Sequence, residues 1–132
     1  MDHLAAGNIF VDVTPLELFR GNTFDLRTRE LTPNKKPDLV TFEKSGIIYA
    51  KKRSGGLSLF DNIYPKYKAK TCRRIVSKTV IPYGLELIKD HQMDGYDIWH
   101  YIAAPRWDMP VAEYINLLET FAKFSMPVVG AK

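Results

Sequence analysis

"GYDIWHYIAA", residues 95–104, is the clearest β-strand pattern in the chain, and the fold is interpreted outward from it. Successive side chains of a strand point to opposite faces, so Trp99 and Tyr101 are predicted on one face and His100 on the other. Isoleucines flank His100 on its own face. A histidine in so apolar a strand is either a hydrogen-bonded core residue or a functional side chain.

Shorter segments rich in β-branched and aromatic residues precede this strand, and turn-forming residues separate them. The sequence predicts strands at residues 8–13, 16–21, 38–42, 46–51, 74–81 and 85–89. Many short strands with few helices predict a small, largely antiparallel α+β fold. The length of 132 residues predicts a single domain that covers residues 1–132.

One helix is predicted after the last strand. Asp108 is expected to cap it, and Pro110 suits its first turn. Apolar residues at helical spacing predict the face that covers the sheet: Val111, Ile115, Leu118 and Ala122, widened by Leu117, Phe121 and Phe124.

The composition suits a folded domain, because 45% of the residues are hydrophobic and the net charge is only +4. Cys72 is the single cysteine, which excludes an internal disulfide. It is either a small strand residue or, beside Arg73 and Arg74, a nucleophile with a low pKa. We find no signal-peptide pattern and no apolar segment of membrane-spanning length, so we expect a cytoplasmic chain with no membrane partner.

Positive charge gathers in one segment, residues 66–78, which contains no acidic residue. Its basic residues are Lys66, Lys68, Lys70, Arg73, Arg74 and Lys78. This basic stripe is either a solvated strand face or a surface that attracts phosphates or an acidic partner.

Several familiar signatures are absent from the sequence. It has neither a phosphate-binding P-loop nor a complete Gly-x-Ser-x-Gly nucleophile elbow. His3, His91 and His100 are scattered and, with a single cysteine, cannot form a standard structural zinc site. No metal site is therefore predicted.

Three short stretches remain as candidates for function. Arg20 and Gly21 end an early strand, Ser58 follows the glycine pair 55–56, and His100 lies in the late strand. Arg20 either pairs with a surface carboxylate or binds an anion, and Ser58 either caps a turn or binds a ligand. The two glycines are predicted to let the chain reverse closely around a ligand.

The order of these stretches resembles the three-part layout of ADP-ribosyltransferases. It is most similar to a growth-inhibiting toxin family of that class, the second exported effector of the type VI secretion system. The shared pattern runs from about residue 37 to about residue 121, with one further match near the N-terminus. It includes "LFR" at 18–20, "PDLV" at 37–40, "SGIIYA" at 45–50, "GG-x-S-x-FD" at 55–61, "VIP" at 80–82 and "HY" at 100–101 with Pro105.

This resemblance implies a split antiparallel sheet that binds NAD. Arg20 is expected to anchor the pyrophosphate, Gly21 to present its N–H to the nicotinamide amide, and Ser58 to bond a ribose hydroxyl. The other residues of the expected cofactor site are Tyr49, Leu57 and Phe60.

The expected catalytic residues are Ser58, His100 and Glu113. His100 stands where the class commonly has a glutamate, and a neutral imidazole brings no negative charge, so Glu113 or Asp61 is expected to supply one. The resemblance implies an NAD-dependent toxin enzyme that modifies an unidentified macromolecule. It also implies a cognate immunity protein, export without a cleaved signal peptide, and action in the target-cell cytoplasm.

Two alternatives stay open on the sequence alone. The basic stripe favours an NAD-dependent RNA phosphotransferase-like enzyme or a nucleic-acid-binding module. The missing glutamate favours a catalytically inert interaction domain that keeps the fold.

Overall fold

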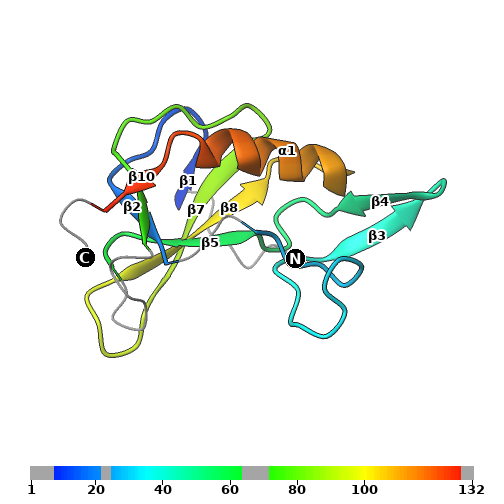
Figure 1. The fold of residues 1–132 in the computed structure, drawn as a ribbon, viewed down its shortest axis with the longest axis horizontal. Helices are drawn as coiled ribbons and strands as arrows, with labels where there is room; N and C mark the ends of the chain where they lie inside the picture. The colour runs from blue at the N-terminus through cyan, green and yellow to red at the C-terminus, as the bar shows by residue number, and fades with distance from the viewer. Residues whose placement is uncertain (1–7, 22–24, 64–71, 129–132) are drawn as a thin grey trace.

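The computed structural model describes residues 8–21, 25–63 and 72–128, which form two antiparallel sheets and one helix (Figure 1). The larger sheet has the strand order β1-β7-β8-β5-β2-β6-β10. Its strands are β1 (Ile9–Phe10), β2 (Leu18–Arg20), β5 (Leu57–Phe60), β6 (Arg73–Ile75), β7 (Leu85–Gln92), β8 (Trp99–Pro105) and β10 (Met126–Pro127). The predicted coarse class, a small and largely antiparallel α+β fold, is confirmed for this part of the chain.

A smaller sheet with the order β3-β4-β9 lies to one side of the larger one (Figure 1). Its strands are β3 (Thr41–Lys44), β4 (Ile47–Ala50) and β9 (Met109–Pro110). Helix α1 (Val111–Ala122) follows β9 directly and crosses the larger sheet. The chain therefore reaches its helix from the small sheet and then packs it on the large one.

The main core lies between α1 and one face of the larger sheet. Leu57, Leu59 and Tyr101 are fully buried there. The Tyr114 hydroxyl ties the helix to two strands, since it donates to the Ala103 carbonyl oxygen at 2.5 Å and accepts from the Leu57 N–H at 3.3 Å. We call this side of the sheet the helix face.

The opposite side of the sheet, here called the open face, carries the alternate residues. Ser58 pairs with Ile102 and Phe60 pairs with His100 across β5 and β8. Ile102 packs in a separate small cluster with Ile88 and Ala104. The predicted alternation is confirmed: Tyr101 lies on the helix face and His100 on the open face.

The predicted start of the helix is wrong. Pro110 is the residue before the helix rather than part of its first turn, and no side chain caps the helix. The Asp108 carboxylate instead accepts a hydrogen bond from the Lys52 N–H at 2.7 Å. Because Met109 and Pro110 pair with β4, the chain is still extended immediately before the helix begins.

The predicted apolar stripe of the helix is only partly correct. The buried residues are Val111, Tyr114, Leu118 and Phe121. The predicted stripe did not include Tyr114, whose hydroxyl makes two bonds with the backbone in the core. Phe124 lies beyond the end of the helix and is 43% exposed.

Several predicted strands are shorter than their sequence patterns, and two of them differ most. Only Ile9–Phe10 forms a strand within 8–13, and the segment 74–81 leaves the sheet after Ile75. The reason is Thr14, whose hydroxyl donates to the Val76 carbonyl and accepts from the Thr79 N–H, both at 2.9 Å. These bonds hold a turn where β-propensity alone predicts continued pairing.

The glycine pair, Gly55 and Gly56, lets the chain pass close to its own backbone. A Cβ at Gly55 would lie 2.2 Å from the Asp38 carbonyl oxygen, and a Cβ at Gly56 would lie 2.3 Å from that of Ala103. Both have positive φ, 143° and 156°. The chain approaches its own backbone here so closely that only glycine fits.

Candidate functional site

Ser58 and His100 meet on the open face of the sheet. Their strands are neighbours, and the register places His100 diagonally from Ser58, with Phe60 directly opposite the histidine. The His100 Nε2 lies 2.8 Å from the Ser58 Oγ. The Phe60 ring packs beside the imidazole, with ring centroids 5.4 Å apart. Ser58 lies within β5, so the alternative of a turn-capping serine is wrong.

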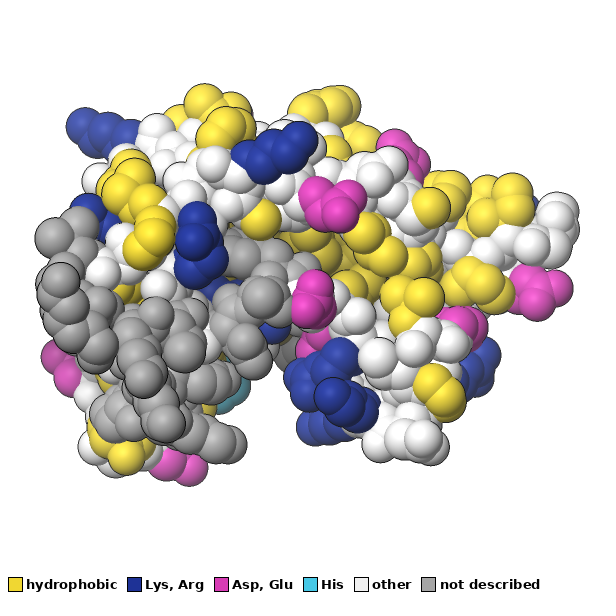
Figure 2. Space-filling view, viewed as in Figure 1, with side chains coloured by type: hydrophobic (Ala, Val, Ile, Leu, Met, Phe, Trp, Pro, Cys, Tyr) yellow, Lys and Arg dark blue, Asp and Glu magenta, His cyan; other side chains and the backbone are white. Residues whose placement is uncertain are grey.

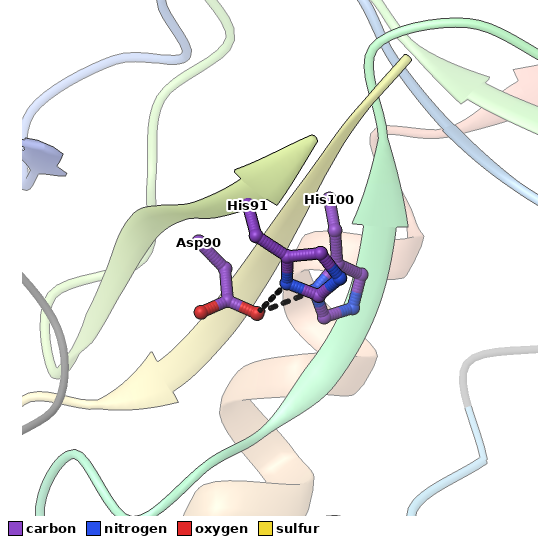
Figure 3. Close-up of side chains that lie close together, drawn as sticks. All are labelled: Asp90, His91 and His100. Carbon is purple, nitrogen blue, oxygen red and sulfur yellow. Dashed lines mark hydrogen bonds and ion pairs between the residues drawn. The ribbon is translucent and has the colours of Figure 1, made fainter. Parts of the chain in front are cut away.

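An irregularity in β7 brings a carboxylate to the same histidine. The register of β7 against β8 shifts between Lys89 and His91, so Asp90 is an extra residue in a β-bulge. Asp90 Oδ2 lies 2.9 Å from the His100 Nδ1 and 2.6 Å from the His91 Nδ1. Figure 3 shows these three side chains converging on one side of the sheet, with the helix behind it.

Ser58, His100 and Asp90 therefore form a continuous hydrogen-bonded chain. An ionised carboxylate only accepts hydrogen bonds, so the Asp90 contact requires the proton of a neutral His100 to be on Nδ1. The His100 Nε2 is then an acceptor that faces the Ser58 hydroxyl. In this tautomer the imidazole can take a proton from that hydroxyl, or from a group that replaces it.

The pKa directions agree with this protonation state. Burial is the largest influence on His100 and lowers its pKa, which the bond and charge of Asp90 offset only in part. For Asp90, burial raises the pKa, but hydrogen bonds from His100 and His91 outweigh it and the net pKa is lowered. At neutral pH the site thus holds a neutral imidazole above a charged carboxylate.

Arg20 contacts the same serine from another direction. Its Nη1 donates to the Ser58 carbonyl oxygen at 2.8 Å. Strand alternation places Arg20 on the side of Leu18, which is the helix face, so the guanidinium reaches Ser58 along the edge of β5. Arg20 and His100 thus both contact Ser58, but through different atoms and from opposite faces of the sheet.

Other predicted site residues lie apart from this serine. Glu113 is exposed on α1, which covers the helix face. Tyr49 belongs to the smaller sheet and stacks on Phe42, with centroids 5.5 Å apart. The Leu57 side chain is buried in the core. Gly21 is buried at the end of β2, next to residues 22–24, which the structure does not describe.

Asp61 has a structural partner. Its carboxylate accepts a hydrogen bond from the Trp99 N–H at 2.8 Å, which closes the end of the β5–β8 pair. It is therefore held at the rim of the sheet, while the negative charge next to His100 comes from Asp90. Asp90 and His91 were missed from the sequence because adjacent strand residues are expected on opposite faces.

The basic stripe is only partly described, since Lys66, Lys68 and Lys70 lie outside the described residues. Arg73 donates to the Ser125 hydroxyl and carbonyl at 2.8 and 2.9 Å. Arg74 forms an ion pair with Glu17 at 3.4 Å. Both arginines of β6 thus hold their own fold together, which weakens the case for a nucleic-acid surface on this strand.

The Cys72 thiol is buried, and burial raises its pKa. A raised pKa disfavours the thiolate, so the structure supports a small packed residue and not a nucleophile.

Figure 2 shows a notch in the molecular outline, with Lys and Arg side chains gathered along one wall. Positive charge at such a notch attracts anionic ligands.

Comparisons with known proteins identify no relative: no protein-family model matches the sequence, and no curated protein matches it. Within the described part of the chain, no helix is long and apolar enough to span a membrane.

Proposed function

We propose that this protein is an NAD-dependent ADP-ribosyltransferase-like enzyme that acts as a growth-inhibiting toxin. The observation that carries the proposal is the convergence of Arg20 and His100 on Ser58, from positions 38 and 42 residues away in the chain. These are the residues that the resemblance assigns to NAD binding and catalysis. Their meeting requires the sheet order β8-β5-β2.

The proposed reaction breaks the bond between nicotinamide and ribose. Nicotinamide leaves with the bonding electrons, positive charge develops on the sugar, and an acceptor hydroxyl or amine attacks. His100 takes the proton that the acceptor loses. The Ser58 hydroxyl, held at 2.8 Å from the imidazole, bonds a ribose hydroxyl and so fixes the sugar near the base.

Asp90 supplies the negative charge that His100 lacks. In the class that this chain resembles, a glutamate steadies the developing cation directly. Here the carboxylate lies behind the imidazole, 2.9 Å from Nδ1, and stabilises the imidazolium that forms when His100 accepts a proton. In this proposal two residues take the place of the glutamate: His100 is the base, and Asp90 supplies the negative charge beside it.

Arg20 places a permanent positive charge beside the serine. Guanidinium groups bind pyrophosphate by charge-assisted hydrogen bonds, so this end of the site suits the phosphates of NAD. A producing cell needs protection from such an enzyme, and we propose a cognate immunity protein as its partner. The target is a macromolecule in the cytoplasm of the recipient cell.

The test is to incubate the pure protein with NAD and bacterial lysate. Mass spectrometry should detect free nicotinamide and ADP-ribose bound to a macromolecule. Ser58→Ala and His100→Gln should lower the rate of nicotinamide release by roughly 10²-fold or more, because each variant lacks one partner of the hydrogen bond between Ser58 and His100. Ser77→Ala is the matched control, since Ser77 lies exposed in the turn after β6. An unchanged rate in both folded site variants excludes the proposed roles.

One observation favours a second candidate, a serine hydrolase. The distances of 2.8 Å and 2.9 Å along Ser58, His100 and Asp90 are those of a nucleophile, a base and an orienting acid. A fluorophosphonate probe distinguishes the two functions. Labelling of Ser58 that His100→Gln abolishes supports the hydrolase, and NAD cleavage without labelling supports the transferase.

A further inference from the structure

We propose that Asp90, His91 and His100 form a binding site for a divalent transition-metal ion, with Zn²⁺ as the best-suited ion. One carboxylate oxygen and one nitrogen from each histidine lie within 4.8 Å of one another. Imidazole nitrogens and a carboxylate oxygen are common zinc ligands, and three protein ligands leave a fourth position for water or a substrate. No metal site was predicted from the sequence.

The β-bulge builds this site. In a regular strand Asp90 and His91 would point to opposite faces, but the extra residue turns both toward the open face, where His100 of β8 faces them. Figure 3 shows one carboxylate oxygen of Asp90 facing both rings, with a dashed line to each. Two neighbouring residues and one from the next strand thus present three ligand atoms to one point.

The spacing of these atoms needs only a small adjustment. Ligands bound to zinc at ~2.1 Å in tetrahedral geometry lie about 3.4 Å apart. The present separations from Asp90 Oδ2 are 2.6 Å to the His91 Nδ1 and 2.9 Å to the His100 Nδ1. His91 can make most of the adjustment, because its side chain is 56% exposed while that of Asp90 is 16% exposed.

A metal at this site has a chemical consequence for Ser58, which rests on the proposed function. A metal on the His100 Nδ1 displaces the proton that Asp90 holds there. A neutral imidazole then carries its proton on Nε2, which donates to the Ser58 Oγ and no longer accepts from it. Binding of Zn²⁺ therefore removes the base and inhibits cleavage of NAD.

Cobalt absorption is the direct test. The chain without an affinity tag is freed of metal and titrated with Co²⁺, whose visible absorption reports its coordination. We expect a saturable band that Zn²⁺ displaces. His91→Ala should weaken Co²⁺ binding by roughly 10–100-fold. Asp94→Asn, in the exposed turn between β7 and β8, is the matched control and should bind normally.

Several outcomes overturn the site: no saturable band, a His91→Ala variant that binds Co²⁺ as tightly as the native chain, or an Asp94→Asn variant that loses the ion equally.

The proposed inhibition by the metal is tested separately through NAD cleavage. Zn²⁺ should inhibit the native chain, and His91→Ala, compared with its own metal-free rate, should need a higher Zn²⁺ concentration. Inhibition at equal concentrations in both contradicts it. If the metal-free protein cleaves no NAD, the proposed function fails, while the absorption still decides the metal site.

Discussion

The carbonyl oxygen and the hydroxyl of Ser58 each have a partner from a different strand. Arg20 of β2 donates to the first, and His100 of β8 bonds the second. The Ser58 backbone is fixed in β5 and contacted by Arg20, and its hydroxyl is bonded to His100, so the hydroxyl points in one direction before any ligand arrives. Such preorganisation is what a site needs to place a sugar within reach of a base.

Replacing Asp90 with Asn tests the hydrogen-bonded chain of Ser58, His100 and Asp90, because it exchanges one carboxylate oxygen for an amide nitrogen. The amide no longer fixes the His100 proton on Nδ1, so we expect the rate of NAD cleavage to fall by roughly 10²-fold or more. In the native protein the lowered pKa of His100 places the acidic limb of the pH–rate profile below 6.5. Because Asp90 raises that pKa, the limb of the variant should move to still lower pH. A limb that moves to higher pH, measured over a pH series on both folded proteins, contradicts this assignment.

The sequence identified Ser58, His100 and Arg20 because each belongs to a local pattern that the resemblance connects. It did not identify Asp90, since the position of that side chain depends on a bulge. A bulge reflects pairing between two strands, and the local sequence of β7 carries no clear mark of it. Glu113 was expected near the site because only its distance along the chain from His100 was known, and not the face that the helix covers.

A buried ion pair beneath the open face gives a second prediction for single residues. The Arg53 Nε lies 2.6 Å from the Glu86 Oε2, and the Glu86 side chain is only 1% exposed. Arg53→Met leaves that carboxylate without this partner, so the free energy of unfolding should fall by about 2–3 kcal/mol, discounted because Arg53 itself is partly exposed. Arg29→Met is the control, since Arg29 pairs with Glu30 at 3.3 Å and their side chains are 77% and 29% exposed, and it should cost under about 1 kcal/mol. Equal losses in urea denaturation would show that burial of Glu86 is not decisive.

At the scale of elements, β5 depends on the glycines that precede it. Gly56 has φ of 156° and lies against the backbone of β8. The chain reverses closely around its own strands, and this brings Ser58 into register with Ile102.

Gly56→Ala should therefore destabilise the protein by about 1–3 kcal/mol from backbone strain, with a further loss from the clash at the Ala103 carbonyl. Gly46→Ala provides the comparison, because Gly46 also has positive φ but its added Cβ would meet nothing within 4 Å. The expected order of stability in thermal unfolding is native, Gly46→Ala, then Gly56→Ala. A Gly56→Ala variant at least as stable as Gly46→Ala would mean that close approach is unimportant.

Strand existence was easier to predict than strand length. Apolar alternation located β8 correctly, because it is a central strand whose two faces both pack. The turn around Thr14 was not visible, since it joins residues more than 60 positions apart through the Thr14 hydroxyl and backbone bonds to Lys78 and Thr79. Likewise, β9 draws Pro110 into an extended conformation that local helix-start rules assign to the first turn.

At the scale of the whole molecule, the larger sheet has two different faces. The helix face holds the main core, with Tyr114 and Phe121 fully buried, whereas the open face carries Ser58, His100 and the bulge. The main core and the proposed active site therefore lie on different faces of the sheet. Substitutions of Ser58 or His100 should change the proposed activity with little effect on folding.

Expression in bacterial cytoplasm tests the proposed toxicity together with this separation. The native chain should arrest growth, and Ser58→Ala should relieve the arrest. The free energy of unfolding of this variant should lie within about 1 kcal/mol of the native value, since the variant loses one neutral side-chain hydrogen bond. Tyr114→Phe makes the opposite change on the helix face. It leaves the open face intact but removes both backbone bonds of a buried hydroxyl, so it should lose about 1–3 kcal/mol and still arrest growth wherever it remains folded. Growth curves at matched protein levels, with denaturation of each purified variant, provide both measurements. Persistent arrest by a stable Ser58→Ala variant removes Ser58 from the mechanism, and loss of arrest by a folded Tyr114→Phe variant shows that the two faces are coupled.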